Sequence, residues 1–244
     1  MYLKWQEKTI TDFSDANIND LYNRGFLFTR EEKGAMYETR SVRVDLSKFI
    51  LSSENRRILR KTEGLEMKVA PIPYADYSWE IGKMGKDFYE TKFGAGVFSA
   101  NKIKELMTDG EKSNFNRLLV YCHSERSEES LSIRQLDKDS STPLRSAQND
   151  SKVGYTICLE TNELIHYCYP FYSLTPNTSN LIPNIGISMM TRAVVWAQEH
   201  DKKYIYLGSA KDAKALYKFQ FEGVEWWDGK KWNTDMEELK NILK

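Results

Sequence analysis

The chain has 244 residues, of which 41% are hydrophobic and 13% aromatic, enough for one full α/β domain with its own core. Lys plus Arg and Asp plus Glu each number 35, and this zero net charge argues against bulk electrostatic capture of DNA, although a local basic patch can still exist. No apolar run reaches the ~20 residues of a membrane helix, and the start, MYLKWQEKTITDF, has no signal-peptide pattern. We expect a soluble, cytoplasmic protein without a membrane partner.

The sequence contains three cysteines, Cys122, Cys158 and Cys168, and no two of them have CxxC spacing. Cys158 and Cys168 lie in apolar, strand-like runs. We therefore expect reduced thiols in a cytosolic core, and the sequence predicts neither a metal site nor a cofactor.

The first half of the chain predicts short helices separated by strands. Asp15–Arg24 is amphipathic and is followed by Gly25, which predicts a helix. Phe26–Arg30 and Met36–Leu46 alternate in polarity, which predicts an antiparallel pair. A helix, SENRRILRKTE, follows a capping serine at 52 or 53. Further elements are expected as a brief strand at Met67–Ala70, a helix at Trp79–Phe93, and a helix at Ala100–Met107 capped by Ser99.

Residues 122–152 are polar and Ser-rich, and they lie between two strand-like runs, Asn116–Tyr121 and Val153–Glu160. A hairpin loop of about 30 residues is much longer than usual. We interpret 122–152 as an inserted loop, expected to be disordered and to lie at an exposed tip. Residues 1–121 and 153–244 are then a single domain, in which the two runs form an antiparallel pair.

The two ends of this insert are related at the level of possible codons. One permitted coding of His123–Glu128 is CAT TCT GAG CGG AGC GAA, and its reverse complement, read in another frame, encodes Arg145–Asn149. The segment resembles a translated palindromic repeat of the kind scattered through bacterial genomes. This resemblance predicts a bacterial source. We therefore do not expect side chains of the insert to belong to a functional site.

The second half predicts the order strand, strand, long strand, helix, strand, short helix, strand. The long strand is Glu163–Leu174, the helix is Asn184–Glu199, and the next strand is Tyr204–Leu207. A turn at Gly208 and a short helix around Tyr217 lead to the last strand of this order, and a small helix, 237–243, closes the chain. This order resembles that of a GNAT acyltransferase core. It implies a mixed α/β fold with a mostly antiparallel sheet flanked by helices.

Three stretches together resemble the C-terminal domain of the aminoacyl-tRNA–protein transferases, the arginyl- and leucyl-transferases of the N-degron pathway. They are Tyr37–Lys61, with an arginine-bearing strand and paired arginines; Ser179–Gly208, with a small-residue helix start and a strand ending YLG; and YKFQF with its downstream tryptophans. The resemblance covers Leu21–Trp232 apart from the insert. It implies transfer of an arginyl or leucyl group from aminoacyl-tRNA to the N-terminal α-amine of proteins that begin with Asp or Glu. The partners would be the tRNA and the acceptor N-terminus.

Two features depart from that family. Its full-length members carry an N-terminal cysteine cluster that this chain lacks, and the family's serine–leucine–glycine–threonine turn is here Asn184-Ile185-Gly186-Ile187-Ser188. Acetyl-CoA users carry Gln or Arg three residues before the glycine, where this chain has Pro183. We therefore expect a donor other than acetyl-CoA, handled differently from the family's donor.

Aminoacyl transfer from tRNA is aminolysis of an ester, which such sites promote by positioning and by backbone donors. Tyr217 is the candidate proton donor to the leaving group, the alternative being a core tyrosine. Ser173, on the carbonyl-facing end of the long strand, is a second catalytic candidate. The helix start at Gly186 and Ser188 offers free N–H groups to the donor.

Cationic residues complete the candidate site. Donor or tRNA contacts are expected from one basic helix face, unless that face is merely solvated, and its members are Arg56, Arg57, Arg60 and Lys61. Lys218 is either a donor-binding residue or an exposed lysine. Arg40 and Arg43 are candidates for binding the acidic first residue of the acceptor. His166 is expected to be a packed histidine.

Two other functions stay open. The first is an acyl-CoA-dependent GNAT N-acyltransferase, against which the missing pyrophosphate signature counts. The second is a non-catalytic descendant that binds a tRNA or a peptide, which the missing cysteine cluster and the neutral charge favour.

Overall fold

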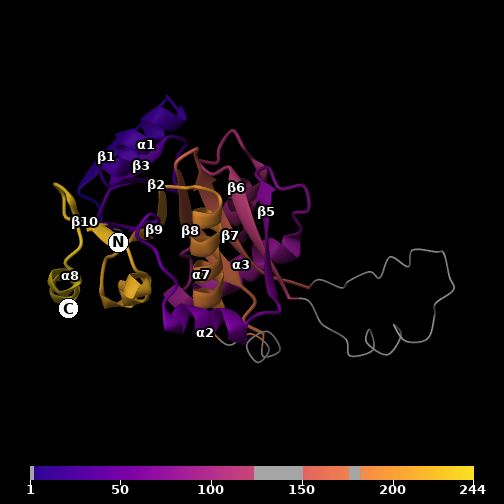
Figure 1. Ribbon diagram of the computed structural model, residues 1–244. Helices are drawn as coiled ribbons and strands as arrows, with labels where there is room; N and C mark the ends of the chain where they lie inside the picture. The colour runs from indigo at the N-terminus through magenta and orange to yellow at the C-terminus, as the bar shows by residue number, and fades with distance from the viewer. Residues whose placement is uncertain (1–2, 124–150, 176–181, 183) are drawn as a thin grey trace.

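The computed structural model describes residues 3–123, 151–175, 182 and 184–244. In this part of the chain, eight strands form one mixed sheet in the order β11-β10-β4-β9-β8-β7-β6-β5, and three short strands form a second sheet in the order β1-β3-β2. Helices cover the large sheet, with α7 in front of it in the view of Figure 1. The expected mixed α/β fold with a mostly antiparallel sheet is confirmed.

The strands of the small sheet are β1 (Gln6–Thr9), β2 (Phe26–Phe28) and β3 (Ala35–Glu38). The strands of the large sheet are β4 (Ser41–Asp45), β5 (Leu65–Pro71), β6 (Arg117–His123), β7 (Ser151–Glu160), β8 (Leu164–Tyr172), β9 (Tyr204–Ser209), β10 (Val224–Trp227) and β11 (Trp232–Asn233). The helices are α1 (Asp15–Asn23), α2 (Ser53–Lys61), α3 (Trp79–Phe93), α4 (Ala100–Thr108), α7 (Ile185–Glu199), the 3-10 helix η2 (Ala213–Gln220) and α8 (Met236–Ile242).

The ladders follow the order that the sequence predicts from β6 onward. β6 pairs with β7, β7 pairs with β8, and both pairs are antiparallel. β8 then pairs with β9 in parallel, because α7 carries the chain back to the same end of the sheet. The predicted pairing of Asn116–Tyr121 with Val153–Glu160 is confirmed.

The ladder between β6 and β7 extends into both ends of the predicted insert. Cys122 pairs with Lys152, and His123 pairs with Ser151. Residues 124–150, which make up the rest of the predicted insert, lie outside the described residues.

Two hydrophobic cores lie on opposite faces of the large sheet. On one face α7 buries Met189, Ala193 and Val194 against residues of β4, β8 and β9. On the other face α1, α3 and α4 pack with β2, and there Gly85 of α3 approaches Phe171 of β8 so closely that a Cβ at residue 85 would lie 3.3 Å from that ring. Burial on both faces explains why strands such as β9 are continuously apolar rather than alternating.

The expected single strand at Met36–Leu46 is wrong, because the chain divides between the two sheets. β3 pairs with β1 and β2, whereas β4 pairs with β9 and β10. The separation falls at Thr39 and Arg40, where the Arg40 carbonyl oxygen accepts a hydrogen bond from the Ala210 N–H. The alternating pattern continues through the bend, so polarity alone does not reveal the change of sheet.

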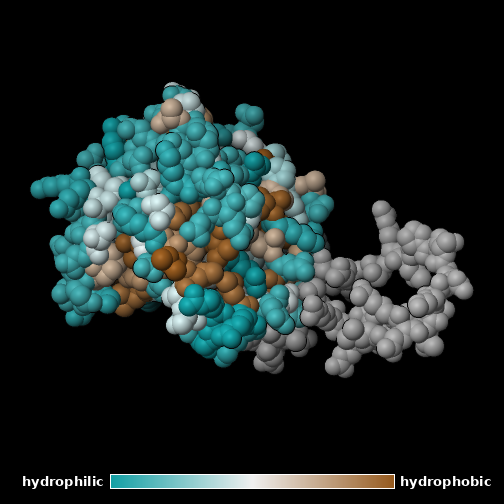
Figure 2. Space-filling view, viewed as in Figure 1, coloured by the Kyte–Doolittle hydropathy of each residue, from teal (hydrophilic) through white to brown (hydrophobic). Residues whose placement is uncertain are grey.

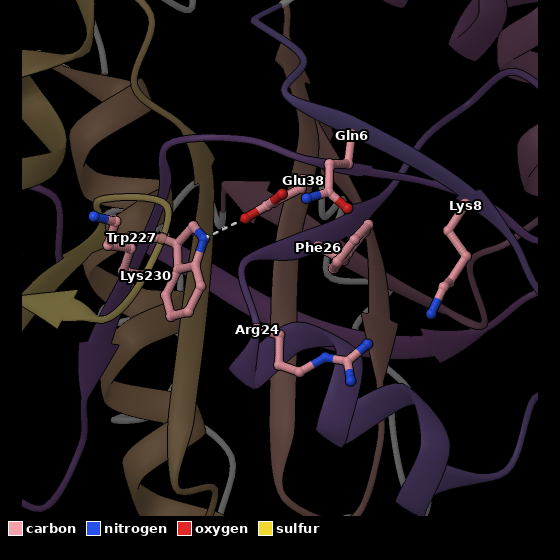
Figure 3. Close-up of a pocket in the computed structure, with 7 residues that line it drawn as sticks. All are labelled: Gln6, Lys8, Arg24, Phe26, Glu38, Trp227 and Lys230. Atoms are coloured by element: carbon pink, nitrogen blue, oxygen red, sulfur yellow. Dashed lines mark hydrogen bonds between the residues drawn. The ribbon is translucent and has the colours of Figure 1, made fainter.

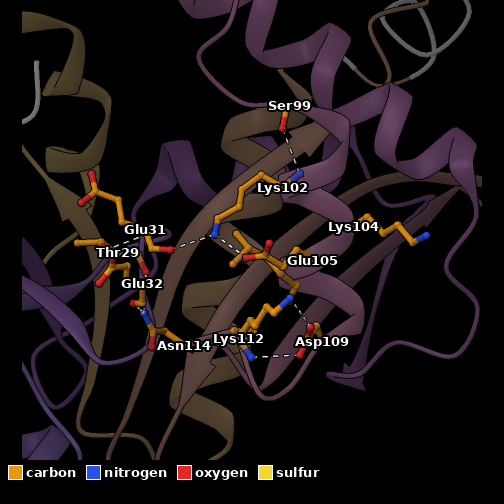
Figure 4. Close-up of polar contacts among 12 residues, drawn as sticks. Thr29, Glu31, Glu32, Ser99, Lys102, Lys104, Glu105, Asp109, Lys112 and Asn114 are labelled. Carbon is orange, nitrogen blue, oxygen red and sulfur yellow. Dashed lines mark hydrogen bonds and ion pairs between the residues drawn. The ribbon is translucent and has the colours of Figure 1, made fainter.

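Polar contacts tie the loop between β2 and β3 to α4 and to the segment after it (Figure 4). Lys102 Nζ donates to the carbonyl oxygen of Glu31 at 3.0 Å and to the Glu105 carboxylate at 2.6 Å. Asn114 Nδ2 donates to the carbonyl oxygens of Thr29 and Glu32. These contacts hold the small sheet on the body of the molecule.

None of the helices that the structure describes has the length and hydrophobicity needed to span a bilayer.

Candidate functional site

The two parallel strands of the large sheet separate part-way along their length. They pair at Leu164 with Tyr204, Ile165 with Ile205, and His166 with Tyr206. Beyond that point β9 stays with β4 while β8 stays with β7, so residues 167–172 of β8 have no strand partner on the β9 side among the described residues. We call this separation the β8–β9 opening. On that side the backbone N–H and C=O groups of residues 167–172 have no ladder partner among the described residues, and such groups can hydrogen-bond a carbonyl-bearing substrate.

Lys218 lies at the β9 side of this opening. Its Nζ donates a 2.7 Å hydrogen bond to the carbonyl oxygen of Ser209, and it lies 3.4 Å from where a Cβ on Gly208 would be. The side chain forms no ion pair with a described residue and the residue is only 9% exposed. Burial lowers the pKa of Lys218 to about 8, because the charged form loses solvation there. The alternative of an exposed lysine is wrong.

The burial of Lys218 follows from the helix type. η2 has three residues per turn, so Ala215, Lys218 and Phe221 share one face, and all three are buried. A period of three in this run could have shown from the sequence that Lys218 points inward.

Tyr217 occupies the neighbouring, outer position on η2. The residue is 46% exposed, so it is not a core tyrosine. Desolvation and the nearby Tyr172 raise the pKa of the Tyr217 phenol, which keeps it protonated at neutral pH. Its ring centroid lies 6.0 Å from Lys218 Nζ. A protonated phenol beside a buried amine can donate and recover a proton.

Tyr172 links the end of β8 to the start of α7, a contact that sequence reasoning did not identify. A Cβ on Gly186 would lie 3.3 Å from the Tyr172 ring and hydroxyl. A side chain at residue 186 would therefore press on the Tyr172 ring and hydroxyl, which lie at the first turn of α7. Asn184, which precedes α7, is left-handed with φ of 59°, and its side chain does not cap the helix. The first N–H groups of α7 have no partner within the helix, as at any helix start.

His166 and Cys168 lie beneath the opening on β8. Tyr22 Oη accepts from the Phe28 N–H at 3.3 Å and lies at hydrogen-bond distance, 3.0 Å, from His166 Nδ1. Burial and the Lys218 charge lower the pKa of His166 to about 3, so it is neutral at physiological pH. Burial raises the pKa of the Cys168 thiol to about 12. At neutral pH Lys218 is therefore the charged side chain here, and the neighbouring His166 and Cys168 are neutral.

The structure also brings α2 to the first turn of α7. The buried Ser188 hydroxyl lies 2.6 Å from that of Thr62, which donates to the Ile58 carbonyl oxygen, so Ser188 is the donor in this contact. Arg192 of α7 donates to the Thr62 carbonyl oxygen. Ser188 therefore faces α2, and neither Thr62 nor Arg192 was identified from the sequence.

The basic residues of α2 differ in how they are engaged. Arg57 pairs with Glu54 at 2.5 Å, and Arg56 donates to the Leu51 carbonyl oxygen. Arg60 and Lys61 are exposed at the C-terminal end of α2 and form no ion pair with a described residue. The unpaired cations are thus at the end of α2 that contacts α7.

The two arginines predicted to bind the acceptor lie in different surroundings. Arg40 Nη1 donates to the Ala210 carbonyl oxygen at 3.1 Å, next to the carbonyl that Lys218 contacts, and Arg40 Nε has no hydrogen-bond partner among the described residues. Arg43 is buried with Glu225, 2.9 Å from its carboxylate. Arg40 therefore shares the end of β9 with Lys218.

The guanidinium of Arg43 lies within the core between two aromatic rings. Its centre is 3.8 Å from the ring centroids of Tyr204 and Trp232, and Nη1 donates to Asn23 and to Tyr206. These contacts occupy Arg43, so an acceptor carboxylate would have to displace them.

Ser173 follows the last residue of β8. Its N–H donates to the Val153 carbonyl oxygen, and its hydroxyl lies 3.1 Å from that of Thr175. Residues 176–181, which follow shortly after in the chain, lie outside the described residues. Ser173 remains a prediction at the rim of the opening.

Hydrophobic side chains gather on the face that carries α7, next to the hydrophilic surface of α2 (Figure 2). Leu216 of η2 is among the exposed hydrophobic residues. No three His, Cys, Asp or Glu side chains in the described ranges are grouped so as to hold a metal ion.

No family model and no curated protein matches the chain. Among solved structures, it is similar to L-PGS from Bacillus licheniformis, with 12% identity and a TM-score of 0.43, over 80% of this chain and 52% of that one. It is also similar to FemX, with 12% identity and a TM-score of 0.44, over 80% of this chain and 60% of that one. The chain thus spans about half to three fifths of the length of these structures.

Proposed function

We propose that the protein transfers an amino acid from aminoacyl-tRNA to the N-terminal α-amine of an acceptor protein that begins with Asp or Glu. The observation that carries the proposal is the β8–β9 opening, which has the buried Lys218 and the protonated Tyr217 on one side and the cationic end of α2 beyond the start of α7. The sequence resemblance to the arginyl- and leucyl-transferases supports the choice of donor.

In this reaction the neutral α-amine attacks the ester carbonyl carbon, a carbon–nitrogen bond forms, and the bond from carbon to the ribose oxygen breaks. Tyr217 gives its proton to the ribose oxygen and is restored by the proton that the attacking nitrogen loses. The ammonium of Lys218 stabilises the negative charge that develops on the carbonyl oxygen. Protons and charge balance without a cofactor.

The acceptor and the tRNA would occupy opposite sides of the opening. Arg40 has one N–H without a hydrogen-bond partner in the described part of the chain and lies at the end of β9, where it would pair with the acidic first residue of the acceptor. Arg60 and Lys61 would contact the tRNA backbone near its acceptor end. Gly186 and the Tyr172 hydroxyl packed on it would border the ester at the first turn of α7.

The test is incubation of the protein with labelled arginyl- or leucyl-tRNA and peptides that begin with Asp or Glu. Label is expected on these peptides and not on the same peptides with an acetylated N-terminus, which have no free α-amine. Turnover of acetyl-CoA without label transfer would instead identify an acyl-CoA-dependent N-acyltransferase. Salt-dependent tRNA binding without either activity would identify a non-catalytic binding protein.

A further inference from the structure

A hollow of about 400 Å³ lies between the small sheet and β10 (Figure 3). It shares no residue with the β8–β9 opening. Seven residues from β1, the end of α1, β2, β3, β10 and the turn after β10 line it: Gln6, Lys8, Arg24, Phe26, Glu38, Trp227 and Lys230. Its volume lies within the roughly 300–1,000 Å³ of ligand sites, and it is open to solvent.

The lining carries three cations and one carboxylate. Neither Lys8 nor Lys230 forms an ion pair with a described residue, and Arg24 has only a 3.5 Å contact with Asp20 at the exposed surface. The head groups of Lys8 and Arg24 are turned toward each other beside Phe26 (Figure 3). Two like charges that converge without a shared carboxylate favour an anion between them.

The remaining wall of the hollow is closely packed and offers a hydrogen-bond acceptor. Trp227 Nε1 donates to Glu38 Oε1 at 2.9 Å, and Trp227 packs on Gly25, where a Cβ would lie 2.2 Å from the indole. Gly25 has φ of +80°, so glycine is required there on both counts. Glu38 Oε2 has no hydrogen-bond partner among the described residues, and it can accept from a hydroxyl or an amine.

We propose that this hollow binds the phosphate backbone of an RNA strand, with a ribose hydroxyl or a base amine donating to Glu38. A polyanion engages several separated cations at once, which one carboxylate or one free phosphate cannot do. The zero net charge of the chain means that such binding depends on local clusters of this kind. The choice of RNA rests on the proposed function, which requires the protein to hold a tRNA.

The experiment measures binding of a labelled, uncharged RNA minihelix with a single-stranded 3′ end over a range of salt concentrations. The double variant Lys8→Ala/Lys230→Ala is compared with the wild type and with Lys104→Ala, which removes an exposed lysine of α4. Each lost phosphate contact lowers the slope of log affinity against log salt by about 0.7–0.9. We therefore expect the double variant to lose about 1.5 units of slope and Lys104→Ala to keep the wild-type slope.

Three results would overturn the proposal. They are a wild type that does not bind the RNA at low salt, a double variant with the wild-type slope, and a double variant that loses binding of polyglutamate but not of RNA. A second double variant, Lys8→Gln/Lys230→Gln, removes the same charges while keeping polar side chains. Its thermal unfolding is measured to show that any loss of RNA binding does not come from a folding defect. The transfer assay is carried out separately. If the wild type transfers label but the double variant keeps the wild-type salt slope, RNA binding at the hollow is rejected and the proposed function stands. If the double variant has a lowered salt slope but the wild type transfers no label, the proposed function is rejected and RNA binding at the hollow stands.

Discussion

Lys218 Nζ donates a 2.7 Å hydrogen bond to the carbonyl oxygen of Ser209, at the end of β9 where that strand has separated from β8. This carbonyl holds an ammonium for which no carboxylate partner is found in the described ranges. The contact therefore places one buried positive charge at the mouth of the opening, and its protonation depends on pH near neutrality.

The first prediction concerns stability against pH. The pKa of Lys218 is lowered to about 8 in the folded state, against an ordinary value of about 10.4, so between these values the unfolded chain binds more protons than the folded one. The free energy of unfolding contributed by this group must then rise with pH across that window, by up to about 1.4 kcal/mol per unit. Well below pH 8 Lys218 is protonated in both states, so its contribution to the free energy of unfolding does not change with pH.

Denaturant unfolding of the wild type and of Lys218→Met at pH 7.5 to 9.5 checks this, because subtracting the variant cancels the contributions of the tyrosines. The difference should move in favour of the wild type as pH rises. A difference that stays constant would show that Lys218 is not buried as a cation.

The second prediction concerns Tyr217. Tyr217→Phe removes the phenolic proton while keeping the ring, so the rate of transfer should fall by about 10²-fold or more, the usual contribution of a general acid. Single-turnover measurement with preformed aminoacyl-tRNA separates this rate from binding. Leu216→Ala, the adjacent exposed position on η2, is the matched control and should keep the wild-type rate. Unchanged transfer in Tyr217→Phe would remove this residue from the mechanism.

The third prediction concerns acceptor choice. Arg40→Gln removes the charge at the end of β9, and KM should rise about tenfold for peptides that begin with Asp or Glu, with little change for peptides that begin with Ala. Steady-state kinetics on both peptide sets measure the difference. Equal effects on both sets would mean that Arg40 only supports the fold.

The fourth prediction separates a structural from a binding role for Arg43. Arg43→Met leaves Glu225 buried with only Lys48, so the free energy of unfolding should fall by about 3 kcal/mol. Arg43→Met/Glu225→Met removes both charges and should be more stable than the single variant. Urea unfolding of the two variants tests this. A stable Arg43→Met protein with weakened acceptor binding would favour the binding role instead.

The elements with strong local signals could be predicted from the sequence. α3 spans the predicted range Trp79–Phe93, Ser52 caps α2, and Ser99 caps α4. These features depend on residues within a few positions of one another, through helical periodicity and capping hydrogen bonds. The pairing of β6 with β7 could be predicted for a different reason: once the polar insert is set aside, the two strand-like runs follow each other directly.

The parts that depend on distant contacts could not be predicted. The polar pattern that continues through Arg40 hides the passage from the small sheet to the large one. Arg43 and Lys218 have the same charge and both lie next to apolar residues in sequence, yet Glu225 neutralises Arg43 and no described carboxylate neutralises Lys218. The register of β4 with β10, which sets Arg43 opposite Glu225, decides that Arg43 is the one that is neutralised.

The most direct test of the central claim is the transfer of labelled amino acid from arginyl- or leucyl-tRNA to a peptide that begins with Asp or Glu, carried out with the wild type and Tyr217→Phe side by side. We expect label on the free α-amine with the wild type and a rate lower by about 10²-fold with the variant. No label on the peptide with any aminoacyl-tRNA, together with turnover of acetyl-CoA, would contradict it.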